Sequence, residues 1–182
     1  MGDHREQLID ISTPEADTDA RIAAVREWLI TAGWAAPFDG TDWMYPAEAA
    51  LGASPELLPR WPGFGAMTFV MLRGDYWAAG DGTTAAACPV CGAESDAWDQ
   101  IEQWGEQRIE PVAQCESCGH QALLGDWDLE GSVAVGSLGI VLDPQSLPRE
   151  GGSFDPADIA RTLRTELAAA LGGRWVYVHH HL

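Results

Sequence analysis

Cys88-Pro-Val-Cys-Gly92 and Cys115-Glu-Ser-Cys-Gly119 contain all four cysteines of this 182-residue chain. Each segment is a Cys-x-x-Cys-Gly knuckle, and 23 residues lie between Cys91 and Cys115. The glycine lets the backbone turn so that amide N–H groups face the two sulfurs. Four thiolates are the ligand set of a closed, tetrahedral zinc site. The sequence therefore predicts one structural Zn²⁺, held by Cys88, Cys91, Cys115 and Cys118.

The chain between and around the knuckles resembles a zinc ribbon. Residues 97–104 and 108–114 are expected to form a hairpin that turns at Gly105-Glu106, and residues 121–124 a trailing strand. The resemblance covers residues 85–126, under a quarter of the chain, and it rests on the four cysteines and the two glycines. It implies a small β module that structural zinc stabilises.

Paired knuckles of this form also resemble rubredoxin, which holds iron and transfers electrons. The likeness stops at the knuckles, and Glu116 follows Cys115 where that family often has proline. Four protein ligands leave a metal no open coordination position, which argues against a catalytic ion at this site. A pairing of the cysteines as disulfides is the remaining alternative.

Two helices are expected outside the ribbon. The first is predicted over residues 14–32, because Thr13 and Pro14 form a helix start, apolar residues recur at helical spacing, and Gly33 can end the helix. The second begins at Asp155-Pro156 by the same reasoning. Its apolar stripe and its stop consist of Ile159, Leu163, Leu167, Leu171 and the pair Gly172-Gly173.

Strands are expected over residues 67–72, 132–142 and 174–182, and a turn at Arg73-Gly74-Asp75 should lead into a hairpin partner at 76–78. Helices and strands in this order predict an α+β fold: a small mixed sheet with two flanking helices and an inserted zinc ribbon. Residues 1–84 and 131–182 together are expected to form the α+β domain, and residues 85–130 the ribbon.

The charge of the chain is strongly negative, at −18, and every basic side chain is one of ten arginines. Residues 92–130 contain ten acidic residues and one basic residue, Arg108. Four thiolates around Zn²⁺ would add about −2. A field of this sign repels phosphates and disfavours nucleic-acid binding. The simplest explanation of the negative charge is solubility. The more specific hypothesis is an acidic face that binds a basic protein or peptide, with Glu116, Asp126 and Asp128 as contacts.

The C-terminal segment carries a histidine cluster. On a strand, His179 and His181 share one face, and with a carboxylate they could hold a second metal ion. Solvated histidines, packing against acidic side chains and a cloning remnant are the alternatives. The segment 34–65 is rich in tryptophan, and Trp43, Tyr45 and Trp61 are expected either to pack the core or to line an aromatic cleft.

The composition and the motifs exclude several classes. No apolar run reaches the ~20 residues of a membrane helix, and residues 1–10 lack the pattern of a signal peptide, so a cytoplasmic location is expected. No nucleophile elbow, phosphate-binding loop or His-Glu-x-x-His helix is present in the sequence. These observations favour a protein that is not an enzyme.

Three functions are compatible with the sequence. The favoured hypothesis is a non-enzymatic, zinc-binding, acidic protein that engages a basic protein or peptide, as an immunity-type protein or an adaptor does. The second is a metal-dependent enzyme that uses the C-terminal histidines and a Trp-lined cleft. The third is a transcription-associated zinc ribbon that acts through protein contacts.

Overall fold

In this computed structural model the described residues are 4–38, 49–61, 67–74, 77–78, 85–129, 131–144 and 155–181. The helices of this part of the chain are η1 (Glu15–Asp17), α1 (Thr18–Thr31), η3 (Pro55–Leu57), α2 (Trp98–Gln107), η5 (Leu124–Asp126) and α3 (Pro156–Leu171). The strands are β1 (His4–Asp10), β2 (Ala35–Pro37), β3 (Ala50–Ala53), β4 (Met67–Arg73), β5 (Trp77–Ala78), β6 (Ala86–Ala87), β7 (Glu94–Ser95), β8 (Val112–Gln114), β9 (Gln121–Leu123), β10 (Val133–Ala134), β11 (Leu138–Pro144) and β12 (Trp175–His181).

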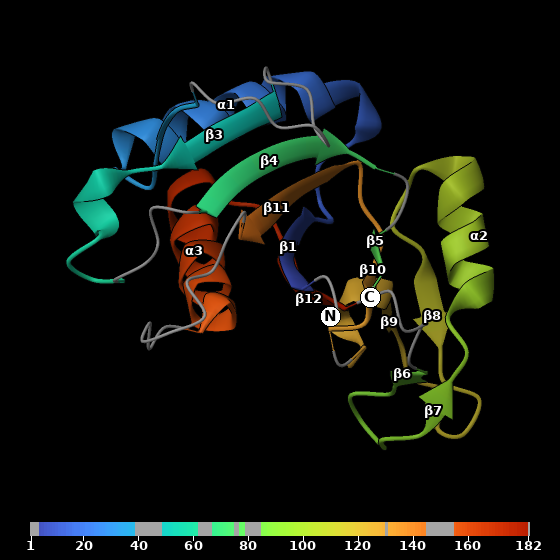
Figure 1. The fold of residues 1–182 in the computed structure, drawn as a ribbon. Helices are drawn as coiled ribbons and strands as arrows, with labels where there is room; N and C mark the ends of the chain where they lie inside the picture. Colours follow the sequence, from blue (N-terminus) through green and yellow to red (C-terminus); the bar gives the residue numbers. More distant parts are fainter. Residues whose placement is uncertain are drawn as a thin grey trace.

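The centre of the fold is a six-stranded sheet in the order β12-β1-β11-β4-β3-β2 (Figure 1). Helices packed on a largely antiparallel sheet confirm the predicted α+β class. The sheet was expected to be mixed, but every pair of neighbouring strands in it is antiparallel. β1, for which the sequence analysis predicted no strand, lies between β12 and β11. It brings the N-terminal residues 4–10 beside the C-terminal strand.

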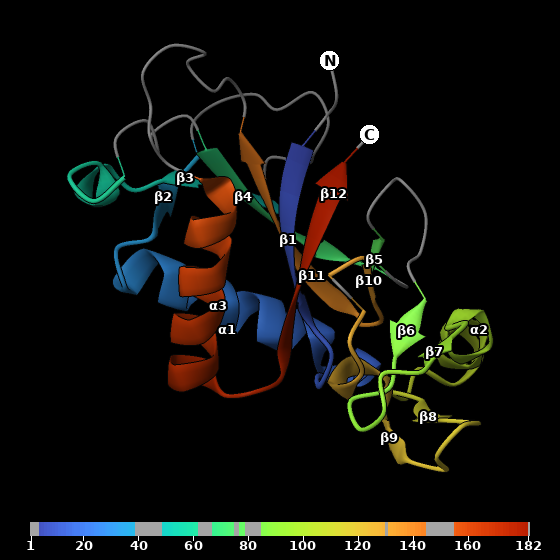
Figure 2. The same ribbon diagram turned by 90° about the horizontal axis from the view of Figure 1, so that it is seen from below.

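Helices α1 and α3 cover the same face of the sheet and pack beside each other (Figure 2). Their buried side chains join those of β1, β4 and β11 in one cluster, whose members include Val25, Leu29, Ile159, Leu163, Leu167, Leu8, Phe69 and Ile140. The apolar stripe that was predicted for the second helix therefore points into the main core. Burial of this stripe is the chief driving force for docking the helix on the sheet.

The start of α3 is confirmed in detail, and that of α1 is not. Asp155 accepts a hydrogen bond from the backbone N–H of Ala157 (2.9 Å), with Pro156 in the first turn. At the other helix, Thr13 donates its hydroxyl to Asp10 instead of capping, and α1 begins at Thr18 after a short 3₁₀ turn. The predicted stop at Gly33 is confirmed, since its φ of 75° is left-handed.

The opposite face of the sheet carries a smaller layer. Strands β5 and β10 pair with each other there, and Trp77 and Ala134 pack against Ile9, Val141 and Val178. We expected residues 76–78 to form a hairpin with the preceding strand. That prediction is wrong: β4 pairs with β3 and β11, and β5 pairs with a strand more than fifty residues away in the chain.

Residues 85–129 form a separate group of small elements at one end of the sheet (Figure 1); we call these residues the cysteine module. The predicted hairpin at Gly105-Glu106 is wrong, because residues 98–107 form helix α2. Ile101 and Trp104 lie on its buried side, three residues apart, which is helical spacing. The module core also receives Val133 and Val135 from the segment that leads back to the sheet.

No helix of the described residues is both long and apolar enough to cross a membrane.

Candidate metal centre

The four cysteine sulfurs lie within 4.8 Å of one another. Cys88 Sγ is 3.8 Å from Cys118 Sγ, and Cys91 Sγ is 3.6 Å from Cys115 Sγ. Tetrahedral bonds of about 2.3 Å from one zinc ion would place its sulfurs about 3.8 Å apart. These distances are too long for disulfides, whose S–S bond is about 2.05 Å, and they fit four ligands of one metal ion.

The two cysteines of each knuckle lie in the turn of a short hairpin. The first knuckle joins β6 to β7, and the second joins β8 to β9. The same hydrogen bond closes both turns: Gly92 N donates to Cys88 O, and Gly119 N donates to Cys115 O, each at 2.8 Å. Both glycines have a positive φ, 71° and 74°, which explains why glycine follows the second cysteine of each knuckle.

Backbone N–H groups favour thiolates at this centre. The N–H of Cys118 contributes most to lowering the pKa of the Cys115 thiol to about 7. The N–H of His120 favours a Cys118 thiolate in the same way, but hydrogen bonds with neighbouring sulfurs, Cys91 foremost, and burial together outweigh it and raise the pKa of Cys118 to about 12. Four negative charges at these distances repel one another, and a divalent cation removes that conflict.

The arrangement is suited to structure rather than to catalysis. Cys88 and Cys115 are buried, whereas Cys91 and Cys118 lie at the surface. Four sulfur ligands complete a tetrahedron and leave no position for a substrate or for water. An ion held there would join the two hairpins, whose strands are only two or three residues long.

His179 has a defined environment in the structure. Its Nδ1 is 2.9 Å from Glu6 Oε2 and 3.1 Å from Glu6 Oε1, and Glu6 also accepts the hydroxyl of Tyr177 (2.6 Å). The side chain of Glu6 is 5% exposed. The backbone of His181 belongs to β12, while its side chain lies outside the described residues. The second metal site thus stays a prediction at this stage.

The three acidic residues that we proposed as partner contacts are all exposed, but they differ in their surroundings. Asp126 forms an ion pair with Arg174, which lies just before β12. The same guanidinium binds Glu110, so that Arg174 connects the cysteine module to the sheet. Glu116, between the cysteines of the second knuckle, and Asp128 lie on the surface of the module. Asp126 therefore has a structural partner within the chain.

A cavity of about 380 Å³ lies between the module and the sheet, with Trp104, Glu110 and Arg108 on the module side. Arg108 has a left-handed backbone (φ 54°), and its guanidinium lies 4.7 Å from the centre of the Trp104 ring. Burial raises the pKa of Glu110 more than the N–H of Gly125 and the charge of Arg174 lower it. Both arginines pair with carboxylates of the chain, Arg108 with Glu15 (3.7 Å) and Arg174 with Glu110 and Asp126.

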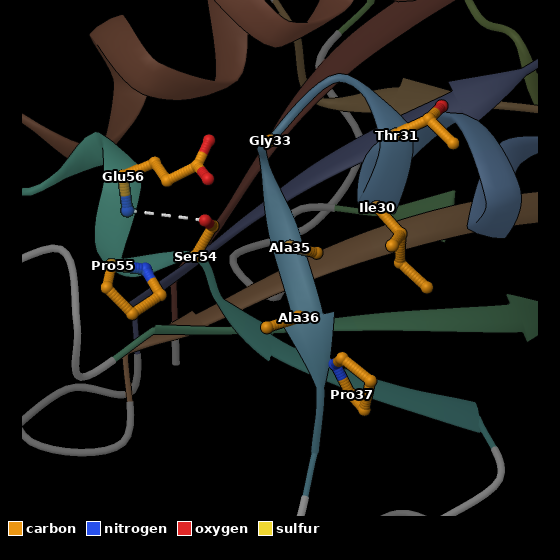
Figure 3. A pocket seen from close by; sticks show the side chains of 9 residues that line it. All are labelled: Ile30, Thr31, Gly33, Ala35, Ala36, Pro37, Ser54, Pro55 and Glu56. Atoms are coloured by element: carbon orange, nitrogen blue, oxygen red, sulfur yellow. Dashed lines mark hydrogen bonds between the residues drawn. The ribbon is translucent and has the colours of Figure 1, made fainter.

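A second cavity, of about 490 Å³, lies where α1 ends and β2 begins (Figure 3). It is lined by Ile30, Thr31 and Gly33, by residues 35–37 of β2, and by residues 54–56. Glu56 is the one ionisable side chain among these, and its backbone N–H donates to Ser54 Oγ (3.3 Å). The other polar side chains among the described lining residues are the hydroxyls of Thr31 and Ser54.

The aromatic segment contributes to the core rather than to a described cleft. The rings of Trp34 and Trp61 lie 5.2 Å apart, and Trp34 donates its indole N–H to Glu166 (2.7 Å). Both pack against the main cluster. Trp43 and Tyr45 lie outside the described residues, so the enzyme hypothesis with its Trp-lined cleft stays a prediction.

Sequence reasoning missed Glu6. Residues 1–10 were considered only as a possible signal peptide, and hydropathy does not reveal that a carboxylate has buried partners. The available signal was the order Glu6, Gln7, Leu8, Ile9 and Asp10, in which two apolar residues are flanked by polar ones. The partners of Glu6 come from more than 170 residues away.

Comparisons of the chain with protein-family models, with curated proteins and with solved structures find no match.

Proposed function

We propose that this chain is a non-enzymatic, zinc-binding protein whose cysteine module, a zinc ribbon by its paired knuckles, presents an acidic and partly apolar surface to a basic protein or peptide. Four sulfurs at tetrahedral distances support zinc as the ion. An immunity-type protein and an adaptor are two forms of such a protein, and both act by charge complementarity. Contact with the transcription machinery remains an alternative that no described contact favours.

The distribution of exposed apolar side chains carries this proposal. Six large apolar side chains of the described residues are exposed, and four of them belong to the module: Val90, Trp98, Ile109 and Val112. Val90 is 66% exposed and Ile109 69%, although the module provides a core for Ile101 and Trp104. Exposed apolar groups concentrated in one part of a protein are typical of a surface that binds a partner.

The charges around these side chains indicate the chemistry of the partner. Eight carboxylates of the module are exposed: Glu94, Asp96, Asp99, Glu102, Glu106, Glu116, Asp126 and Asp128. Its one basic residue, Arg108, is half-buried against Trp104. A ligand with positive charge and apolar anchors would complement both properties, and electrostatic attraction would speed its association.

An array of immobilised arginine- and lysine-rich peptides, with and without leucine or tryptophan, tests the proposal with the zinc-loaded full chain. We expect binding to peptides that carry both positive charge and apolar side chains, weakening as salt rises. Trp98→Ala and Glu102→Lys should each weaken this binding about 5-fold or more, because an interface residue of either kind contributes on the order of 1 kcal/mol.

Glu27→Lys is the matched control for Glu102→Lys. Both residues are exposed glutamates on a helix, but Glu27 lies on α1, outside the module. The overall change in charge is therefore identical. Equal losses with the two variants would show that net charge alone attracts the peptides. Equal binding of peptides with and without apolar side chains would exclude the exposed apolar side chains of the module from the contact.

A further inference from the structure

Strand β8 (Val112–Gln114) of the cysteine module pairs with β9 on one side, and no described strand pairs with it on the other. At one end of this pair, Leu124 N donates to Pro111 O at 2.9 Å. At the other end, Cys115 N donates to His120 O at 2.8 Å. The odd-numbered residues of the segment 111–115 therefore turn their backbone groups towards β9, because hydrogen-bonded and non-hydrogen-bonded residues alternate along an antiparallel pair.

The two even-numbered residues, Val112 and Gln114, turn their N–H and C=O groups to the free edge of the strand. These four groups have no hydrogen-bond partner among the described residues. Both residues are exposed, Val112 by 54%, so another chain can reach the edge. An accessible edge with unpaired backbone groups is a template for the addition of a further strand.

The outer strands of the large sheet are protected in ways that β8 is not. β2, the last strand at one side, contains Pro37, which has no N–H to donate. β12, the last strand at the other side, is partly covered, because His179 N donates to Gly131 O at 3.3 Å. β8 contains neither a proline nor a charged residue. Proteins usually protect free edges with such devices, so an edge without them is suited to binding a partner.

The side chains near this edge indicate which strand would fit it. Val112 lies in β8, and Ile109, three residues earlier, is 69% exposed, so both provide apolar surface. Glu116, two residues after β8, is exposed, and residues 92–130 contain ten acidic residues and one basic residue. Alternate residues of a strand share one face. Apolar residues on one face of an added strand would lie beside Val112, while basic residues on the other would lie in the negative field of the module.

We propose that an extended segment of the partner, with apolar and basic residues in alternation, adds to β8 as a third strand of the second knuckle hairpin. This inference rests on the proposed function and adds the mode of binding to it. An antiparallel segment would exchange two hydrogen bonds with Val112 and two with Gln114, so that every second residue of the segment faces β8. These bonds provide affinity through the backbone, and the side chains select the sequence.

Two peptides of equal composition test the added strand with the zinc-loaded full chain. One alternates arginine and valine three times, and the other has three arginines followed by three valines. The alternating peptide should bind about 5-fold more tightly or better, because only its valines share one face of a strand.

N-methylation of the alternating peptide tests the backbone bonds. Residues directly opposite in a pair share a face, so the valines lie opposite Val112 and Gln114, and their N–H groups face β8. N-methylation of the valines should weaken binding about 10-fold or more, and N-methylation of the arginines less than about 3-fold.

Val112→Pro and Val112→Ala are a matched pair of variants. Both remove the valine side chain, but only proline removes the outward N–H, and the bonds with β9 remain in both. Val112→Pro should weaken binding of the alternating peptide about 10-fold or more, and Val112→Ala about 3-fold or less. If Val112→Pro loses its zinc, hydrogen exchange of the wild-type chain replaces it. The peptide should then slow exchange at the N–H of Val112 and Gln114 and leave that of Ala113 unchanged.

The outcomes separate this inference from the proposed function. Equal binding of the two peptides, or equal losses from the two methylations, would overturn the added strand while a basic and apolar partner of the module stays supported. Failure of both peptides to bind would overturn both proposals.

Discussion

The indole ring of Trp77 lies against the backbone of Gly139, so closely that a Cβ on residue 139 would be 2.4 Å from the ring. Gly139 lies in β11, in the middle of the sheet, and Trp77 belongs to the layer that β5 and β10 form over it. The contact requires a residue without a side chain, and the same ring also approaches Gly74. The Trp77 ring thus contacts strand backbone in addition to the apolar side chains of its cluster.

Gly139→Ala should therefore lower the free energy of unfolding by about 1–3 kcal/mol, the usual cost of overpacking a core. Urea denaturation, followed by far-UV circular dichroism, measures the change. Gly105→Ala is the matched control, because Gly105 lies exposed in α2 and a methyl group added there would meet no neighbouring side chain within 4 Å. That variant should gain up to about 1 kcal/mol in helix propensity. A neutral Gly139→Ala would contradict the close packing.

The sequence predicted the elements whose signals are local. The second helix was predicted from Asp155-Pro156 and its apolar stripe, and each of these features acts within one or two turns of the chain. The strand at β4 was predicted from an apolar run. The cluster of four sulfurs followed from cysteine spacing, since the knuckle geometry depends on five consecutive residues.

The elements that were missed depend on distant partners. Residues 4–10 form an internal strand only because Glu6 and Asp10 find partners elsewhere in the chain. The pairing of β5 with β10 cannot be read from either segment alone. Helix α2 had a local signal, the spacing of Ile101 and Trp104, but Gly105 and the likeness to a zinc ribbon favoured a hairpin.

Arg21 joins three elements around Asp10, whose side chain is fully buried. Its Nε donates to Asp10 (2.7 Å), and its two terminal nitrogens donate to the carbonyls of Leu171 (2.9 Å) and Gly172 (2.8 Å) at the end of α3. Arg21→Ala should destabilise the protein by about 3–5 kcal/mol, because it leaves a buried carboxylate without its cation. Thermal and urea unfolding measure this loss.

Arg73→Ala removes an ion pair that is exposed, in contrast to the buried pair of Arg21 and Asp10. Arg73 contacts Asp19 at 2.6 Å, but 49% and 81% of the two side chains are exposed. An exposed pair contributes about 0–1 kcal/mol, so this variant should unfold close to wild type. Similar losses for Arg21→Ala and Arg73→Ala would refute the distinction between the buried and the exposed pair.

Glu110 should make stability depend on pH in a defined direction. Burial raises its pKa in the folded protein above the value of the unfolded chain. A raised carboxyl pKa favours the fold while the group is protonated, so its contribution is complete below the unfolded value of about 4.5 and is lost as pH rises through the folded value. The free energy of unfolding of wild type minus that of Glu110→Gln should therefore fall as pH rises above about 4.5.

Chemical unfolding of both proteins at each pH measures this difference. Zinc release at low pH lowers the free energy of unfolding of both proteins alike, so it does not change the difference. Glu102→Gln, at an exposed position of α2, is the control and should give a curve parallel to wild type. A constant difference between wild type and Glu110→Gln would mean that Arg174 and Gly125 offset the effect of burial on Glu110.

Zinc should determine whether the cysteine module folds. Its strands contain two or three residues each, and its core depends on Ile101, Trp104 and Leu124 packing between the two hairpins. Structural zinc contributes about 10–16 kcal/mol in small zinc-binding peptides at neutral pH, far more than such a core can supply. Cys115→Ser should therefore lower the zinc content by one ion per chain and unfold the module, while residues 1–84 and 131–182 keep the sheet.

The zinc content is best counted in a His179→Ala background, so that it refers to the cysteines alone. Ser117→Ala, between the same two cysteines, is the control and should retain the ion. Hydrogen exchange should show lost protection in α2 and β8 with retained protection in β1 and β11. Two outcomes would contradict a zinc-dependent module: one zinc ion retained after Cys115→Ser, or protection lost in the sheet as early as in the module. In either case the four sulfurs would not be what holds residues 85–129 together.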